Sequence, residues 1–174
     1  MLRIMAAFTI ATLPSLGPAD AQLRFGDVNA IVQLQRAADS YAFLHRQVER
    51  RLGMAHTTPD AGAMAAAMRE ARAGAAPGEF FSPAAAVTLR DALARAARAP
   101  GCDAGDRRGS GGSVQVNGPA TATRRLPDCL ADALPHLPEE LEFRSAGSTL
   151  VLVDGHANLV VDVLPAALTN TDTK

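Results

Sequence analysis

The stretch from Asp27 to Gly53 constrains the fold of this chain more than any other part of the sequence. Its apolar and amphipathic residues recur at alternating steps of three and four, the spacing of one face of an α-helix. This face comprises Ile31, Leu34, Ala38, Tyr41, His45, Val48 and Leu52. Asp27 is a candidate N-cap, and Gly53 can end a helix in the left-handed conformation. We expect a helix of roughly 25 residues whose apolar face packs against the rest of the chain.

Two shorter helices should follow, each opened by a polar cap and a proline in the first turn. The Thr-Pro pair at 58–59 begins the second helix, which should run to about Ala73. The Ser-Pro pair at 82–83 begins the third, which should end near Ala99. We expect the two phenylalanines at 80–81 to close the end of the helical layer rather than to line a ligand site.

The C-terminal part of the chain has the pattern of β-strands. Residues 141–144, 149–153 and 159–164 are apolar-rich runs separated by turn signals, which predicts a three-stranded antiparallel meander. The last two runs are apolar at successive positions, so both faces of the sheet should be at least partly covered. The expected fold class is α+β, with three helices packed on one face of this small sheet.

A Gly-rich loop at 100–112 and a short strand at 113–116 should join the helices to the sheet region. The loop lacks the Lys-Ser/Thr and following helix of a phosphate-binding loop, so it is expected to be a surface loop. Four Leu-Pro pairs lie beyond it, and residues 126–138 should form an extended strap with a short turn at 128–133. The expected organisation is a signal peptide at 1–21, a helical region at 22–99, a Gly-rich loop and short strand at 100–124, and a strap and meander at 125–174 that forms one domain with 22–99.

The N-terminus resembles a secretory signal peptide. Arg3 precedes a largely apolar stretch at 4–17, and Ala19-Asp20-Ala21 is an A-x-A cleavage site before Gln22. Cleavage between Ala21 and Gln22 would give a periplasmic or secreted product without a stable membrane span; an uncleaved anchor is the alternative. No later segment has the ~18–20 consecutive apolar residues of a membrane span.

Composition excludes some partners. The net charge is −1, so there is no overall positive field to attract nucleic acid, and no nucleic-acid partner is expected. All of the 17 basic residues except Lys174 are arginine, which we interpret as codon bias. With no Trp and a single Tyr, the core should consist of Ala, Leu and Val.

Cys102 and Cys129 are the two cysteines of the chain. In an oxidising compartment such a pair is expected to form a disulfide. The bond would close a loop of about 28 residues, which the chain-entropy relation values at roughly 3–4 kcal/mol. A reactive thiol pair is the alternative, although the C-x-x-C arrangement is absent.

His45 takes a position on the long helix that otherwise calls for an apolar residue. None of the four histidines stands in an H-x-x-x-H or H-E-x-x-H spacing, so we expect no bound metal or cofactor, and a hydrogen-bonded structural role for His45. The alternative is a metal site in which His45 and His156 converge with Asp154.

Asp162 interrupts the apolar run of the last predicted strand. An unpaired buried carboxylate is costly, so its side chain must reach solvent, a backbone donor or a cation, and Arg144 is one candidate. A catalytic role of Asp162 together with Asp154 and His156 would lack an identified nucleophile, and no G-x-S-x-G context occurs. We therefore expect no enzymatic activity.

Two resemblances accompany these patterns. Residues 39–50, 137–144 and 156–162 together resemble an uncharacterised family of small secreted bacterial proteins, from which no activity can be transferred. The runs at 150–154 and 159–163 are similar to the small β module of the periplasmic nickel/cobalt homeostasis family, which would imply a role in metal homeostasis. Members of that family tend to be rich in His and aromatic residues, whereas this chain has four His and one Tyr.

The sequence thus favours an exported, non-enzymatic interaction protein that uses the apolar helix surface or the sheet to form a homodimer or to bind an envelope protein. The second hypothesis is a periplasmic metal- or small-ligand-binding module centred on His45, His156 and Asp154. A hydrolase without a recognisable motif is the third.

Overall fold

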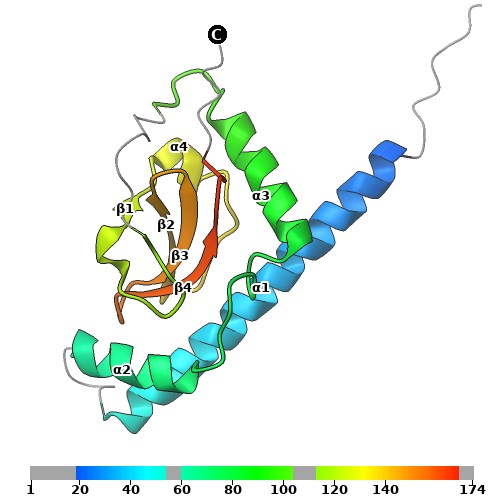
Figure 1. The fold of residues 1–174 in the computed structure, drawn as a ribbon. Helices are drawn as coiled ribbons and strands as arrows, with labels where there is room; N and C mark the ends of the chain where they lie inside the picture. The colour runs from blue at the N-terminus through cyan, green and yellow to red at the C-terminus, as the bar shows by residue number, and fades with distance from the viewer. Residues whose placement is uncertain (1–18, 54–59, 104–112, 169–174) are drawn as a thin grey trace, which may run out of the picture.

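The computed structural model describes residues 19–53, 60–103 and 113–168, and has the expected α+β architecture (Figure 1). A long helix, α1, packs beside a four-stranded antiparallel sheet, and α2 and α3 cross α1 and pack against it. The helices are α1 (Ala19–Arg51), α2 (Ala61–Ala71), α3 (Pro83–Ala96), the short 3₁₀ turn η2 (Ala120–Ala122) and α4 (Asp128–Ala131). The strands are β1 (Arg124–Arg125), β2 (Leu141–Ala146), β3 (Thr149–Asp154) and β4 (Leu159–Leu164).

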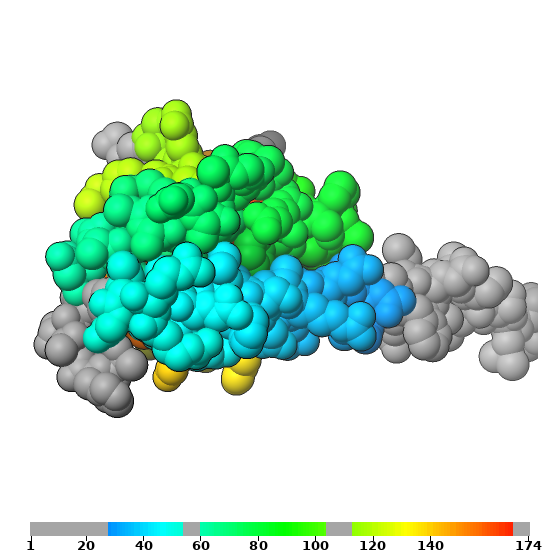
Figure 2. Space-filling model, turned by 90° about the horizontal axis from the view of Figure 1, so that it is seen from below, coloured from blue at the N-terminus to red at the C-terminus, as the bar shows by residue number. Residues whose placement is uncertain are grey.

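The predicted apolar face of α1 is the face that packs against the body of the protein. Leu34, Ala38, Tyr41, His45 and Val48 are buried, Ile31 is partly buried, and Leu52 is exposed near the helix end. Figure 2 shows α1 crossing the molecule as a continuous rod, with its opposite side open to solvent. The prediction of Asp27 as an N-cap is wrong, because the helix begins at Ala19. Gly53 has the left-handed conformation expected after a helix, with φ of +70°.

The sequence predicted the N-cap of α3 correctly but not that of α2. Ser82 caps α3 by accepting from the amide of Ala85, with Pro83 in the first turn, as expected. The cap of α2 is Asp60, which accepts from the amides of Gly62 and Ala63, so the prediction of Thr58 is wrong. Both helices end earlier than predicted; α2 ends at Ala71 and α3 at Ala96.

The sheet has the order β1-β2-β3-β4, and all neighbours are antiparallel. The three-stranded meander is confirmed, and β1 adds a two-residue edge pair to β2 that the sequence did not indicate. Residues 113–116 form no strand, so that prediction is wrong. Their neighbours 117–120 instead bond to the backbone of Asn158 and Val160.

Alternation along β3 divides the core into two layers. Leu150 and Leu152 belong to the large cluster shared with the helices, whereas Val151 and Val153 form a small cluster on the other face with Ala120 and Val114. Asp154 follows in the same alternation, so its side chain lies on the helix-facing side of the sheet. Both faces of the central strand are therefore covered, as its continuous apolar run predicted.

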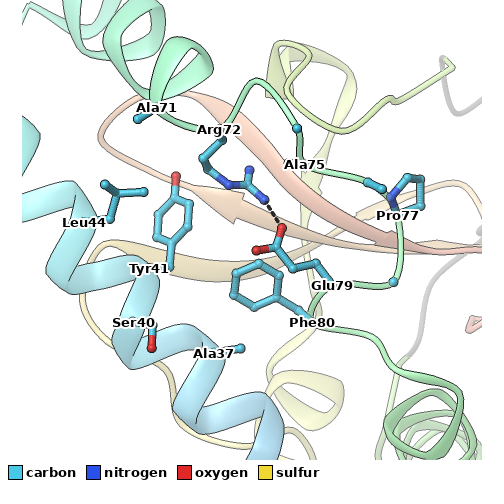
Figure 3. Close-up of a pocket in the computed structure, with 13 residues that line it drawn as sticks. Ala37, Ser40, Tyr41, Leu44, Ala71, Arg72, Ala75, Pro77, Glu79 and Phe80 are labelled. Atoms are coloured by element: carbon cyan, nitrogen blue, oxygen red, sulfur yellow. Dashed lines mark hydrogen bonds and ion pairs between the residues drawn. The ribbon is translucent and has the colours of Figure 1, made fainter.

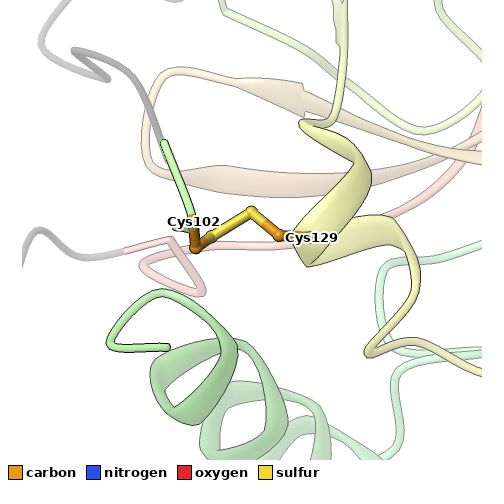
Figure 4. The surroundings of a disulfide bond; sticks show 2 residues. All are labelled: Cys102 and Cys129. Carbon is orange, nitrogen blue, oxygen red and sulfur yellow. A yellow bond between two sulfur atoms is a disulfide. The ribbon is translucent and has the colours of Figure 1, made fainter. Parts of the chain in front are cut away.

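A disulfide joins Cys102, just beyond α3, to Cys129 in α4, with an S–S distance of 2.05 Å (Figure 4). The strap carrying Cys129 buries Leu126, Leu130 and Leu134 against the main core. This pairing and the short helical turn in the strap confirm two expectations from the sequence.

Residues 1–18 of the expected signal peptide lie outside the described part of the chain, as do Thr58, Pro59 and most of the Gly-rich loop. Ala21 and Gln22 lie in the first turn of α1, and cleavage between them stays a prediction. Among the described residues, no helix combines the length and apolarity needed to span a membrane.

Candidate functional site

The centre of the site is a buried contact between α1 and the end of β3. His45 Nδ1 lies 2.7 Å from Asp154 Oδ2, and both side chains are completely shielded from solvent. His45 lies on the buried face of α1, and Asp154 lies on the helix-facing side of β3 because side chains alternate along a strand. The two side chains therefore face each other. The structure thus gives His45 the hydrogen-bonded environment expected for it.

Asp154 accepts two further hydrogen bonds. The hydroxyl of Tyr41, one turn before His45 on α1, donates to Oδ2 at 2.7 Å, and the amide of Ala157 donates to Oδ1 at 2.8 Å. All three bonds favour the ionised carboxylate, because a carboxylate can only accept. Since Asp154 accepts, His45 must carry a proton on Nδ1. The other ring nitrogen, Nε2, points away from Asp154 toward Glu49.

The electrostatics of the three buried groups reinforce one another. Burial favours neutral Asp154, but the hydrogen bonds from His45, Ala157 and Tyr41 outweigh it and lower the pKa of this carboxyl group below its usual value. Burial also opposes the charged form of His45, yet Asp154 and then Glu49 outweigh it and raise the pKa of the imidazole. For Tyr41, burial and then the charge of Asp154 raise the pKa far above the usual range, so its hydroxyl remains a donor.

Glu49 and His156 complete a cluster around the second nitrogen of His45. Glu49 Oε1 is 3.2 Å from His45 Nε2, and His156 Nδ1 is 3.9 Å from the same oxygen. The rings of the two histidines are edge to face, with centroids 5.4 Å apart. One ligand atom from each of the three residues lies within 4.8 Å of the other two. The side chains of Glu49 and His156 are 26% and 45% exposed, so the cluster has a buried side and an open side.

The structure brings together His45, His156 and Asp154, the three residues of the metal-site alternative, but in a different order. Asp154 bonds to Nδ1 of His45, away from His156. Glu49, rather than Asp154, is the carboxylate that lies beside Nε2 of His45. Glu49 was missed, although it stands four residues after His45 on the same helix face. His136 is exposed and is not part of the cluster, and His56 lies outside the described residues.

Asp162 is a structural anchor rather than part of this site. Its buried carboxylate accepts from the amides of Gly78, Phe80, Phe81 and Val163 at 2.8–2.9 Å. The candidate pairing with Arg144 is wrong, because Arg144 bonds instead to Glu142 on its own strand. Backbone donors, one of the three environments expected for Asp162, therefore satisfy its charge.

A third buried carboxylate, that of Glu140, lies immediately before β2. Its Oε1 is 2.5 Å from Nη1 of Arg46, the residue after His45, and its backbone carbonyl accepts from the amide of Gly155. Oε2 of Glu140 is buried and has no hydrogen-bond partner among the described residues. The C-terminal part of α1 is thus held against one end of the inner strands β2 and β3 by two contacts, from His45 to Asp154 and from Arg46 to Glu140.

Comparisons of this chain with models of protein families, with curated proteins and with solved structures found no match.

Proposed function

We propose that this protein binds a divalent transition-metal ion, with Zn²⁺ the best fit, through His45 Nε2, a carboxylate oxygen of Glu49 and His156 Nδ1. Two imidazole nitrogens and one carboxylate oxygen form a donor set typical of zinc sites that keep an open position. The observation that carries the proposal is the convergence of these three atoms within 4.8 Å of one another.

The distances suit such an ion. A tetrahedral zinc ion with bonds of about 2.1 Å separates its ligand atoms by about 3.4 Å. The separations from Glu49 Oε1 are 3.2 Å to His45 and 3.9 Å to His156, on either side of that value. His156 lies in the exposed turn between β3 and β4, where a small side-chain rotation can close the longer distance.

The groups behind the ligands also support the proposal. Metal-binding histidines commonly donate their other N–H to a carboxylate, which fixes the tautomer and increases the basicity of the coordinating nitrogen. Asp154 accepts such a bond from His45 and is itself held by Tyr41 and the amide of Ala157. A histidine with a purely structural role needs only one hydrogen-bond partner. Here the carboxylate of Asp154 accepts three hydrogen bonds, and His45 Nε2 lies beside Glu49 and His156, two residue types that bind metal ions.

Three protein ligands leave a fourth position for water or for a small ligand on the open side of the cluster. In the absence of an ion, His45 can donate from both nitrogens and link Asp154 to Glu49 as a buried imidazolium. This is the structural role that the sequence favoured. A metal-binding role and a purely structural role of His45 predict different results: only the first predicts that one equivalent of metal binds, which can be measured directly.

The test is isothermal titration calorimetry of untagged, EDTA-treated and dialysed protein with ZnCl₂, together with metal analysis after gel filtration. One equivalent of zinc should bind to the wild type. Glu49→Gln and His156→Gln remove partly exposed ligands without opening the core, and each should weaken binding at least tenfold. His136→Gln is the matched control, since His136 is an exposed histidine outside the cluster.

Wild-type protein that retains no zinc, or loss of affinity in His136→Gln equal to that in His156→Gln, would refute the proposal. His45→Gln is a less informative variant, because removal of a buried partner of Asp154 can unfold the protein.

The expected association through the α1 surface or the sheet stays a prediction. The sequence argument for association was the apolar surface of the long helix, and within the described residues most of that face packs against the chain's own elements. Among the residues whose burial the structure describes, the large apolar side chains that remain exposed are Val28, Phe43, Leu52 and Val87. Phe43 and Leu52 are nine positions apart, which places them on opposite sides of α1.

A further inference from the structure

A groove separate from the histidine cluster lies between α1, the end of α2 and the connection to α3 (Figure 3). Its volume is about 670 Å³, within the range of about 300–1,000 Å³ that is usual for small-molecule sites. Ala37, Ser40 and Leu44 of α1 line one side, and residues 74–80 line the other. The aromatic side chains of Tyr41 and Phe80 lie at its base.

Arg72 supplies a positive charge to this groove from a nearly buried position. Its side chain is 5% exposed, and its guanidinium carbon lies 5.2 Å from the ring centre of Tyr41 and 5.9 Å from that of Phe80. Nη1 donates to the Asn117 side chain and Nη2 to the carbonyl of Val161. These partners are neutral, so they orient the guanidinium without neutralising it.

Glu79 is the carboxylate that pairs with Arg72 within the described structure. Its Oε2 lies 2.9 Å from Nη2, and its side chain is 51% exposed (Figure 3). The ion pair therefore joins a buried, fixed cation to a half-solvated anion that can return to water. An exposed partner of this kind contributes little net stability.

The segment that carries Glu79 is anchored at both sides of this residue. The amides of Gly78 and Phe80 donate to the buried carboxylate of Asp162. The wall of the groove is therefore preformed, and displacement of the Glu79 side chain requires a rotamer change rather than a backbone rearrangement.

We propose that this groove binds a small molecule with one carboxylate and a flat apolar body. The ligand carboxylate replaces that of Glu79 on Arg72, and the apolar body lies against Tyr41, Leu44 and Phe80. The charge on Arg72, the aromatic base and the small alanine side chains along the walls together select this chemical class. The groove shares Tyr41 with the hydrogen-bond network behind His45, but none of the three proposed metal ligands lines it.

Phenylacetate is a suitable probe, and uncharged phenylacetamide is its matched chemical control. Saturation-transfer NMR and calorimetry in buffer with EDTA keep any metal ion from binding the carboxylate. Phenylacetate should bind and the amide should bind at least tenfold more weakly.

The Glu79→Gln variant removes the internal competitor. It should strengthen phenylacetate binding roughly two- to fivefold, the range that corresponds to a partly exposed ion pair. Glu70→Gln, an exposed glutamate of α2 outside the groove, should leave the affinity unchanged.

A second pair of variants tests the location. Ser40→Leu adds volume on the α1 side of the groove and should weaken phenylacetate binding, whereas Asp39→Leu, at the neighbouring exposed position, should not. The proposal is overturned if neither the wild type nor Glu79→Gln binds phenylacetate in the saturation-transfer and calorimetric experiments, or if the amide binds equally well. Glu49→Gln should bind phenylacetate like the wild type, so failure of the metal proposal and failure of this one are distinguishable.

Discussion

Asp154 lies 2.7 Å from His45 across 109 positions of sequence, and neither side chain reaches solvent. The contact fixes the position of α1 along the end of β3, because only one helical position can place an imidazole against this carboxylate. A buried charged group that loses its partner is strongly destabilising. The same contact that would prepare His45 for an ion therefore also contributes to the fold.

Asp154→Asn should weaken zinc binding about 10- to 100-fold, the usual effect of removing a carboxylate behind a histidine ligand. If the amide oxygen takes the Oδ2 position, the NH₂ group faces the amide of Ala157, which is also a donor. Calorimetry with ZnCl₂ measures the affinity, and circular dichroism confirms the fold. Asp132→Asn, at an exposed position after α4, is the control. Unchanged affinity in Asp154→Asn would show that Asp154 does not tune His45.

Tyr41→Phe should lower the free energy of unfolding by about 1.5–3 kcal/mol, since it removes a hydrogen bond to a buried charged acceptor and leaves the ring in place. Urea denaturation of metal-free protein measures the change. Ser40→Ala removes the exposed hydroxyl of the preceding residue and should change stability by less than about 0.5 kcal/mol. Equal effects of the two substitutions would contradict the importance of the Tyr41 bond to Asp154.

The α+β architecture could be predicted because its helices and strands are indicated by patterns of residues close together in the sequence. The three- and four-residue spacing on α1 predicts which face of the helix is buried, and the continuous apolar runs at 149–153 and 159–164 predict a sheet covered on both faces. The ends of helices were less predictable, because several polar residues near each start can act as a cap. Asp60 competes with Thr58 only two positions away, and the sequence does not show which side chain meets the free amides.

Asp162→Asn should lower the free energy of unfolding by about 3 kcal/mol, because the substituted amide cannot accept all four backbone hydrogen bonds. Hydrogen exchange should also accelerate at the amides of Gly78, Phe80 and Phe81. Asp91→Asn, on the exposed side of α3, should change neither property. Unchanged exchange at these amides in Asp162→Asn would mean that other contacts hold the segment.

Replacement of Cys102 and Cys129 by serine should lower the free energy of unfolding by about 3–4 kcal/mol, the value expected for a closed loop of this length. Urea denaturation of the double variant measures the loss. Wild-type protein treated with a reductant should unfold at the same urea concentration as the double variant. A loss of less than about 1 kcal/mol would mean that the reduced, unfolded chain is already compact.

The candidate sites were harder to predict than the fold. His45 was identifiable because it interrupts an apolar stripe, but Glu49 has the common helical spacing of a solvated charge pair. The convergence of His156 with His45 was only an alternative, because no residue spacing in the sequence places the turn that carries His156 beside α1. The environment of Asp162 depends on backbone amides some eighty residues earlier, and backbone groups have no sequence signature. Arg72 was missed for a related reason, since it follows the last turn of α2 and its burial depends on Tyr41 and Phe80.

The wide sequence separation between His45 and Asp154 also sets an order of events during synthesis. The ribosome completes α1 long before the hairpin that carries Asp154 and His156, so a partly made chain has two of the proposed ligands on one bare helix. Two ligands on an isolated helix hold an ion far more loosely than three in a packed cluster. A chain that stops before residue 154 should therefore neither bury His45 nor retain an ion, and tight metal retention would report that translation has reached the final hairpin.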